Sequence, residues 1–241
     1  MMLLGVLNAP DAELANVRYW TLGESRQCAL MRPKGMIILG DLDKQQCRSI
    51  AEQVTELDYK GVIGPDDTAA HFVARARQLG IVFLDPMLQR IHSLAEPPRY
   101  PGTPGDARRA TLDDAPLLAE WMSAFVREAT PHDTPPTIKN IEKGILEARY
   151  FLWVDGAQPV STAAIVRRTR NTGGIAAVFT PQHLRGKGYA GSATAAVVAA
   201  LFGEGKTEAC INTDLSNPMS NRCYEKIGFK PVCDAAFFPR R

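Results

Sequence analysis

Residues 175–200 read IAAVFTPQHLRGKGYAGSATAAVVAA, and this stretch decides the fold. Its first residues are apolar and predict a strand that ends near Thr180, whereas its last residues are small and predict a long helix that begins near Gly188. Between them, residues 185–188 alternate two cations with two glycines. Because glycine has no Cβ, backbone N–H groups can approach a ligand closely, and the helix start adds unpaired donors and a partial positive charge. The stretch therefore predicts a binding site for a phosphate group.

The glycines also match the dinucleotide-binding pattern G-x-G-x-x-G, which begins here at Gly186. That pattern requires its first glycine directly after a strand and an acidic residue about 20 positions further on. Residues 181–185 intervene in this chain, and the nearest acid at a predicted strand end, Asp214, lies 28 positions past Gly186. The mononucleotide phosphate loop does not match either, because no Ser or Thr follows Lys187. The glycine pattern alone is therefore weak evidence for a nucleotide.

Two segments resemble motifs of the GCN5-related N-acetyltransferases. Residues 180–190, TPQHLRGKGYA, resemble the loop that holds the pyrophosphate of acetyl-CoA in that family. Residues 217–229, NPMSNRCYEKIGF, resemble the family's last helix and the turn into its final strands. A predicted strand at residues 208–213 separates the two segments, as the family's order requires. The resemblance covers residues 106–237.

The resemblance implies roles for particular residues. The strand before the loop supplies backbone groups to the pantetheine arm and to the acetyl carbonyl, and this role maps onto residues 177–180. The loop and the helix start hold the pyrophosphate. Tyr224 maps onto the catalytic tyrosine that donates a proton to the sulfur of CoA. The residues expected to bind acetyl-CoA are Val178, Phe179, Thr180, Arg185, Gly186, Lys187, Gly188, Tyr189, Ala190 and Asn217.

Most of these residues also fit ordinary structural roles. Residues 177–180 suit a plain sheet strand, and a tyrosine on an amphipathic helix, such as Tyr224, usually belongs to the core. Asn217 followed by Pro218 is a typical helix start, so Asn217 suits a cap as well as a bond to the pantetheine arm. The loop at residues 185–190 is the exception, because a plain helix start does not require two glycines and two cations together.

The base that accepts the proton of the amine is not identified. The predicted strand at residues 175–180 carries no acid, whereas some members of the family have a glutamate there. Each other candidate suits a surface or cap position as well as a base; these are Glu128, His132, Asp133, Asp155 and His183.

Composition excludes several classes of protein. A chain of 241 residues predicts one or two domains, and its net charge of +2 gives no steering toward nucleic acid or a membrane surface. The segment RRTR at residues 167–170 is basic but short, so it predicts a solvated surface. Five scattered cysteines predict neither a disulfide framework nor a zinc site, and they indicate a reducing compartment. We expect no metal cofactor.

No targeting or membrane segment is predicted. Residues 2–7 are apolar but lack the basic flank of a signal peptide, and no apolar run approaches the ~18 residues of a membrane span. We therefore expect a cytoplasmic protein with no nucleic-acid or membrane partner; a homodimer is left open.

A proline-rich segment, EPPRYPGTPGD at residues 96–106, divides the chain. Prolines at this density exclude helix and interior strand, so residues 96–105 are predicted to link a small α/β domain at residues 1–95 to an acetyltransferase domain at residues 106–241. In the first domain we expect strands at residues 17–22, 27–31, 36–39, 60–63 and 80–84, and helices at residues 43–57 and 68–79. This order is similar to a two-domain subgroup of the family, in which the first domain would be a smaller, degenerate copy of the second.

The second half predicts an α/β fold with a mixed sheet. Thr111-x-x-Asp114 resembles a capping box at the start of a helix. Helices are expected at residues 115–128, 137–148, 188–202 and 218–227. Strands are expected at residues 107–110, 149–154, 160–167, 175–180 and 208–213, with a last strand after residue 229.

Taken together, these observations predict an enzyme, an acetyl-CoA-dependent N-acetyltransferase. It would move the acetyl group to a primary amine of an unidentified small molecule or peptide. The alternative is an acyl-CoA-binding sensory or regulatory module without turnover. Tyr224 favours the enzyme, and the missing acid on the strand keeps the alternative open.

Overall fold

The computed structural model describes residues 17–21, 27–31, 34–131 and 133–241. The apolar stretch at residues 2–7 and the candidate base His132 lie outside the described residues. No helix within the described part of the chain is long and apolar enough to cross a membrane.

The chain forms two compact units, and the second half contributes to both of them. Unit 1 comprises the described residues of Met1–His92 together with Asn212–Pro218 and Pro231–Arg241. Unit 2 comprises Ser93–Ile211 and Met219–Lys230. The proline-rich segment falls inside unit 2. That residues 96–105 link two independent domains remains a prediction.

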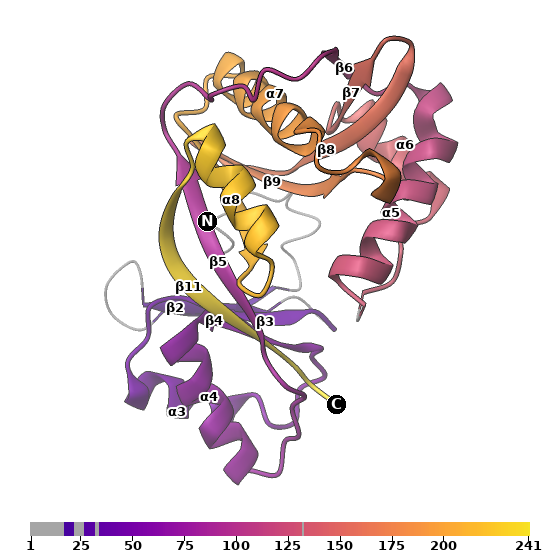
Figure 1. Cartoon of the computed structure of the whole chain (residues 1–241). Coiled ribbons are helices and arrows are strands. Elements are labelled where there is room, and N and C mark those ends of the chain that lie inside the picture. Colours follow the sequence, from indigo (N-terminus) through magenta and orange to yellow (C-terminus); the bar gives the residue numbers. More distant parts are fainter. Residues whose placement is uncertain (1–16, 22–26, 32–33, 132) are drawn as a thin grey trace. The chain divides into compact units, whose positions relative to one another are not determined.

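Unit 1 contains a mixed sheet with the strand order β1-β2-β3-β4-β11 (Figure 1). The pairs β1/β2, β2/β3 and β4/β11 are antiparallel, and β3/β4 is parallel. Its strands are β1 (Arg18–Thr21), β2 (Cys28–Met31), β3 (Met36–Leu39), β4 (Gly61–Pro65) and β11 (Lys230–Pro239). β2, β3 and β4 are short and largely apolar, as expected for strands in a buried sheet.

Two helices, α3 (Lys44–Gln53) and α4 (Asp66–Gln78), complete the core of unit 1. Helix α3 begins at a full capping box, in which Asp43 accepts the Gln46 N–H at 2.8 Å and the Gln46 side chain accepts the Asp43 N–H at 3.0 Å. In α4, acids in the first turn and arginines in the last turn complement the helix dipole.

The structure differs from the expected strand at residues 80–84. Only Phe83 forms a bridge, to Arg240, while the Ile81 N–H donates to the Ala76 carbonyl at 3.0 Å. That hydrogen bond belongs to the C-terminal end of α4. The Ile81 N–H is therefore used by the helix end and is not available to a strand ladder. The next segment forms β5 (Met87–Leu94).

In unit 2, five strands of a mixed sheet lie side by side in the order β10-β9-β8-β7-β6. All its pairs are antiparallel except β9/β10, which is parallel. The strands are β6 (Asp106–Arg109), β7 (Tyr150–Asp155), β8 (Gln158–Arg168), β9 (Thr172–Phe179) and β10 (Glu208–Asp214). The sheet confirms the mixed α/β fold class that the sequence predicts.

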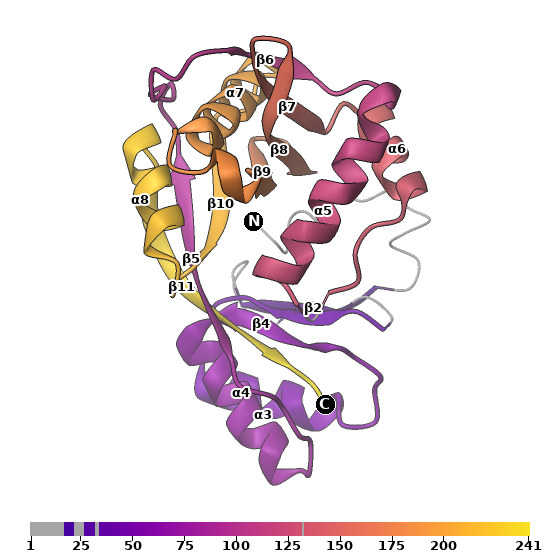
Figure 2. The ribbon, with the colours of Figure 1, turned by 45° about the vertical axis from the view of Figure 1, so that its right-hand side comes forward.

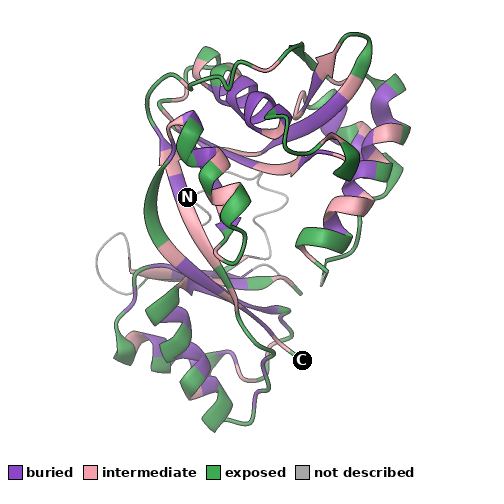
Figure 3. Ribbon diagram, viewed as in Figure 1, coloured by how far each residue is buried: buried purple, intermediate pink, exposed green. Residues whose placement is uncertain are grey.

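Helices cover both faces of this sheet (Figure 2). Helices α7 (Tyr189–Gly203) and α8 (Pro218–Ile227) share one hydrophobic cluster with the sheet, and α5 (Ala115–Ala129) and α6 (Ile138–Leu146) share another. Ten of the 15 residues of α7 are buried, and Figure 3 shows burial along most of its length. A helix of small apolar residues can be enclosed in this way because it has no polar face to solvate.

Asp114 fixes the start of α5. Its carboxylate accepts the Thr111 N–H at 2.7 Å and two bonds from the Arg108 guanidinium, at 2.7 and 2.8 Å, so the predicted capping box is confirmed. The bonds to Arg108 and Thr111 lower the pKa of the Asp114 carboxyl to about 2. Because this pKa lies below that of an unfolded aspartate near 4, the stabilisation is present above pH 4 and is lost as pH falls toward 2.

We expect Asp114→Asn to lower the free energy of unfolding at pH 7 by about 2 kcal/mol, since a pKa shift of this size corresponds to that energy. The difference from wild type should shrink between pH 4 and pH 2. Urea unfolding at a series of pH values measures it. Asp113→Asn, at the exposed neighbouring residue, is the control, and an equal loss in both variants would contradict the role of Asp114.

Three hydrogen bonds fasten the proline-rich segment to unit 2, although most of its residues are exposed. The Arg99 N–H donates to the Ile227 carbonyl at 2.8 Å, and the Trp153 indole N–H donates to the Pro104 carbonyl at 2.8 Å. The Thr103 and Ser192 hydroxyls form the third bond. Cleavage within the segment therefore requires local opening.

Trp153→Phe should accelerate tryptic cleavage after Arg99 by roughly five-fold, because losing one hydrogen bond makes local opening easier by about 1 kcal/mol. The rate is followed by mass spectrometry under native conditions. Trp121→Phe removes similar bulk from the other face of the sheet and is the control. Equal acceleration by both variants would mean that the indole bond does not hold the segment.

Candidate functional site

Strand β9 contains a bulge near its end. Thr162 pairs with Phe179 and Ala164 with Ala176, so two steps along β8 oppose three steps along β9. The extra residue lies next to Ala177, whose φ of 54° is in the left-handed region that alanine rarely adopts. Bulges of this kind redirect backbone groups and are common beside active sites.

Within unit 2, the parallel ladder of β9 with β10 runs from Thr172↔Glu208 to Ile175↔Ile211. Strand β9 continues for four more residues, to Phe179. On the side that would face β10, these residues have no ladder partner within unit 2. An unpaired strand edge offers backbone N–H and C=O groups to a ligand.

The end of β9 is anchored by polar side chains. Ser161 donates to the Phe179 carbonyl at 3.0 Å, and its hydroxyl lies 2.9 Å from the buried Thr180 hydroxyl. Arg185 Nε donates to the Thr180 carbonyl at 2.9 Å. Val178, Phe179 and Thr180 were expected to contact the ligand through their backbone. The carbonyls of Phe179 and Thr180 already accept these hydrogen bonds, whereas the Val178 carbonyl accepts neither of them. The sequence analysis missed Ser161, although a polar pair within an otherwise apolar strand, at residues 161–162, was the available signal.

The loop after β9 requires its two glycines for different reasons. It passes through a short 3₁₀ turn (Gln182–Leu184) and then adopts positive φ at Gly186 (83°) and Gly188 (87°). A Cβ at Gly186 would meet nothing within 4 Å, so the backbone is open to a ligand there. At Gly188 a Cβ would lie 2.6 Å from the Thr103 methyl carbon. The space through which a ligand was predicted to approach Gly188 is therefore filled by the Thr103 side chain.

Helix α7 begins at Gly188 without a side-chain cap. The first N–H groups of a helix have no partner within the helix, and the dipole makes this end partially positive. Lys187 directly precedes it and is exposed. Ala190, in the first turn, is only partly buried. These features can hold an anion.

Arg185 connects the loop to α5. Its guanidinium lies 2.5 Å from the Glu128 carboxylate and 5.8 Å from the centre of the Phe179 ring. Nearly half of each charged side chain is exposed, so the ion pair stabilises the fold by no more than about 1 kcal/mol. A phosphate could replace Glu128 as the partner of Arg185 at little cost.

The side chain of Tyr189 does not face this loop's ligand side. Its hydroxyl donates to Asp155 at 2.5 Å, and this bond raises the pKa of Tyr189. The expected contribution of Tyr189 is therefore limited to its backbone N–H. Asp155, a candidate base, is committed to the tyrosine.

Tyr224 lies on α8, buried in the same hydrophobic cluster as α7. Its ring meets Phe229 edge-on at 6.1 Å between centroids, and burial raises the pKa of its hydroxyl well above the usual range. Within the part of the chain that the structure describes, no residue hydrogen-bonds this hydroxyl. Tyr224 is thus a core residue whose phenol stays protonated and able to donate.

Asn217 directly precedes α8 and is exposed. Its backbone N–H donates to the Asp214 carbonyl at 3.1 Å. It belongs to unit 1, whereas Tyr224 and the loop belong to unit 2. Its expected bond to the pantetheine arm remains a prediction.

The remaining candidate bases are not gathered at one place. Glu128 pairs with Arg185, Asp133 donates its backbone N–H to the Thr130 carbonyl at 2.8 Å, and His183 is exposed on the 3₁₀ turn. In the part of the chain that the structure describes, no group of three or more His, Cys, Asp or Glu side chains is arranged to hold a metal ion.

Residues 107–230 match the family model of the acetyltransferase (GNAT) domain. The match spans 124 of the 241 residues, just over half of the chain. This chain belongs to the GNAT acetyltransferase family. The family predicted from the sequence is confirmed, and it supports acyltransferase activity with acetyl-CoA as the typical donor.

Solved structures share the fold at low sequence identity. A Drosophila protein matches with a TM-score of 0.69 and 11% identity, covering 93% of this chain and 79% of that one. A GCN5-related N-acetyltransferase from Kribbella flavida matches with a TM-score of 0.62 and 15% identity, covering 95% and 91%. A putative GNAT acetyltransferase from Novosphingobium aromaticivorans matches with a TM-score of 0.59 and 16% identity, covering 98% and 96%. No curated protein matches the chain.

If the loop and the start of α7 hold a pyrophosphate, CoA should raise the melting temperature by mass action, and pantetheine, which lacks the pyrophosphate, should raise it much less. Lys187→Glu reverses one charge beside the helix start and should weaken CoA binding about ten-fold. Calorimetry and thermal unfolding measure both effects.

Lys139→Glu makes the same charge change at an exposed position on α6 and is the control. Gly188→Asp is less informative, because any side chain there collides with Thr103. Equal CoA stabilisation of wild type and Lys187→Glu would place the pyrophosphate elsewhere.

Proposed function

We propose that this GNAT protein is an acetyl-CoA-dependent N-acetyltransferase that acts on a primary amine of a small molecule or peptide. The observation that carries the proposal is the sequence of features along one segment of unit 2. A bulged strand with an unpaired edge is followed by an open glycine turn and an uncapped helix start. Together they offer backbone groups to an extended arm and an anion site at its end.

The pyrophosphate of CoA would bind the backbone N–H groups of residues 186–190. Lys187 supplies a full charge there, and Arg185 supplies a second by exchanging Glu128 for a phosphate oxygen. The dipole of α7 adds to both. This assignment uses the exposed side of the loop, away from the Thr103 contact.

The pantetheine arm and the acetyl group would lie along the unpaired edge of β9. A backbone N–H beside the bulge at Ala177 would polarise the thioester carbonyl, because charge develops on its oxygen as the amine attacks. Ser161 and Arg185 hold the carbonyls of Phe179 and Thr180, beyond the bulge. The backbone N–H that would polarise the thioester is therefore fixed in position before the substrate binds.

In the reaction, the neutral amine nitrogen attacks the carbonyl carbon, a C–N bond forms and the C–S bond breaks. Tyr224 would give its proton to the departing sulfur. A phenol with a raised pKa is a weaker acid than a thiol near pKa 8.5, so the proton must move as the C–S bond breaks. The proton that the amine loses would pass to water, because β9 carries no acid and Asp155 is bonded to Tyr189.

The lack of an acid on β9 supports a second candidate, an acyl-CoA-binding regulatory module without turnover. The two candidates share the CoA site and differ only in chemistry. Acetyl-CoA-dependent thiol release, measured across a panel of amines, separates them.

Tyr224→Phe removes only the phenol oxygen. If Tyr224 protonates the leaving sulfur, kcat should fall by roughly 10²–10⁴, while KM for acetyl-CoA should change little because the interaction is made in the transition state. The melting temperature should stay close to that of wild type, since no described residue bonds this hydroxyl.

Tyr150→Phe, in the cluster on the other face of the sheet, is the matched control and should keep full activity. Full turnover in a well-folded Tyr224→Phe protein would remove Tyr224 from the mechanism. No turnover by wild type on any amine, with CoA binding intact, would favour the regulatory module.

A further inference from the structure

Three residues form a row across the middle of the sheet of unit 2. Arg167 on β8 pairs with Gly174 on β9, and Gly174 pairs with Cys210 on β10. The row lies on one face. A Cβ at the preceding Gly173 would collide with Leu201 of α7, so the alternate residue Gly174 faces away from α7.

The neighbours along β10 agree with this direction. Ala209 and Ile211, on either side of Cys210, belong to the cluster that contains α7. Cys210 therefore faces away from α7, as Gly174 does. Arg167 lies on the same face, where Gly174 places no side chain beside it.

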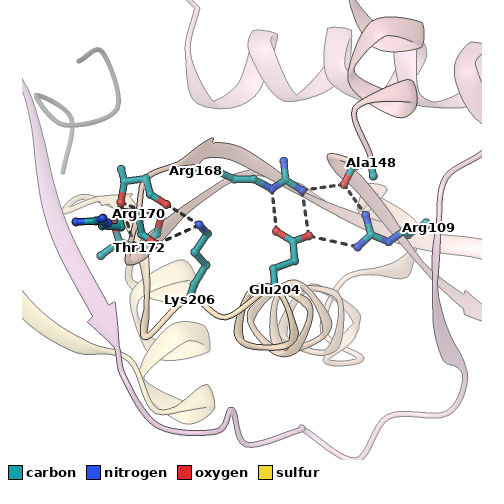
Figure 4. Close-up of polar contacts among 8 residues, drawn as sticks. Arg109, Ala148, Arg168, Arg170, Thr172, Glu204 and Lys206 are labelled. Carbon is teal, nitrogen blue, oxygen red and sulfur yellow. Dashed lines mark hydrogen bonds and ion pairs between the residues drawn. The ribbon is translucent and has the colours of Figure 1, made fainter. Parts of the chain in front are cut away.

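Arg167 and Arg168 have opposite environments. Arg168 donates to Glu204 at 2.9 and 3.3 Å and to the Ala148 carbonyl at 3.2 Å, and Arg109 donates to the same two groups (Figure 4). Arg167 has a buried Nε without a hydrogen-bond partner among the described residues, and no ion pair there includes it. The solvated surface predicted for residues 167–170 does not describe Arg167.

A partly buried guanidinium without a counter-charge is expensive. Burial lowers the pKa of Arg167, which shows that the site disfavours the charge, and burial raises the pKa of the Cys210 thiol to about 11, so the thiol stays neutral and cannot balance it. Natural proteins pair such charges or use them to bind a ligand.

We propose that Arg167 binds the carboxylate of the acyl acceptor, so that the amine substrate is one that also carries a carboxylate. A guanidinium presents Nε–H and Nη–H as two parallel donors, and a carboxylate accepts both. One carboxylate also balances one guanidinium. The inference rests on the proposed acetyltransferase function and names the substrate class of that site.

The register limits the shape of the acceptor. Gly174 lies four residues before Val178, about 13 Å along the strand at ~3.3 Å per residue. An acceptor that reaches from Arg167 toward the acetyl group therefore has its amine and its carboxylate several bonds apart. ω-Amino acids and short peptides have this shape.

The test is thermal unfolding of the full chain with 6-aminohexanoate, hexanoate and hexylamine. Both carboxylates should raise the melting temperature of wild type, and hexylamine should not. Arg167→Met should abolish the carboxylate effect while leaving the unliganded protein at least as stable, because an unpaired charge is replaced by an apolar chain of similar length.

Arg170→Met removes the same charge from an exposed residue and should keep the carboxylate effect. Arg167→Lys keeps the charge but loses the paired donors, so it should bind the carboxylates about ten-fold more weakly and serves if the Met variant does not fold. Equal shifts in wild type and Arg167→Met, or none in wild type, would overturn the inference. A larger shift with 6-aminohexyl phosphate would overturn the choice of carboxylate.

Turnover supplies the second readout. Wild type should prefer 6-aminohexanoate to hexylamine in kcat/KM by at least about ten-fold, and Arg167→Met should lose the preference without slowing hexylamine. A protein that acetylates both amines equally would refute this inference alone. A protein that binds carboxylates through Arg167 but does not bind CoA would refute the proposed function alone.

Discussion

The close approach of α7 to its sheet is the constraint on which the rest of unit 2 depends. Gly173 on β9 has no room for a side chain beside Leu201, and α7 is built of small residues for most of its length. The loop at residues 180–188 alone connects β9 to α7. The helix therefore begins near the end of the strand. The predicted anion site, the glycine turn and the bulged strand are therefore close together in the structure.

Features that depend on neighbours in the chain could be predicted from the sequence. The capping boxes at Asp43 and Asp114, the positive φ at Gly186 and Gly188 and the start of α7 all follow from residues within four positions of one another. Each such motif has few alternatives, because a cap or a left-handed turn admits few residue types. The family was recognised for the same reason.

Features that depend on distant partners could not be predicted. Nothing in the local pattern shows that Glu128 pairs with Arg185, that Thr103 fills the space beside Gly188, or that Tyr189 bonds to Asp155. These contacts join residues at least 34 positions apart, and they decide which predicted groups remain open to a ligand. The unpaired Arg167 shows the same limit, since its sequence context resembles that of its paired neighbour.

The return of β11 to unit 1 bears on the order in which the protein folds during synthesis. Val62 on β4 pairs with Phe238 on β11, and Ala236 and Phe238 belong to the core of unit 1. Strand β4 is therefore made well before the strand with which it pairs, and most of unit 2 is synthesised between the two. Such long-range pairing slows folding and leaves the edge of β4 exposed in the meantime. Nascent unit 1 thus keeps an unpaired strand edge that other chains can reach until β11 has been made.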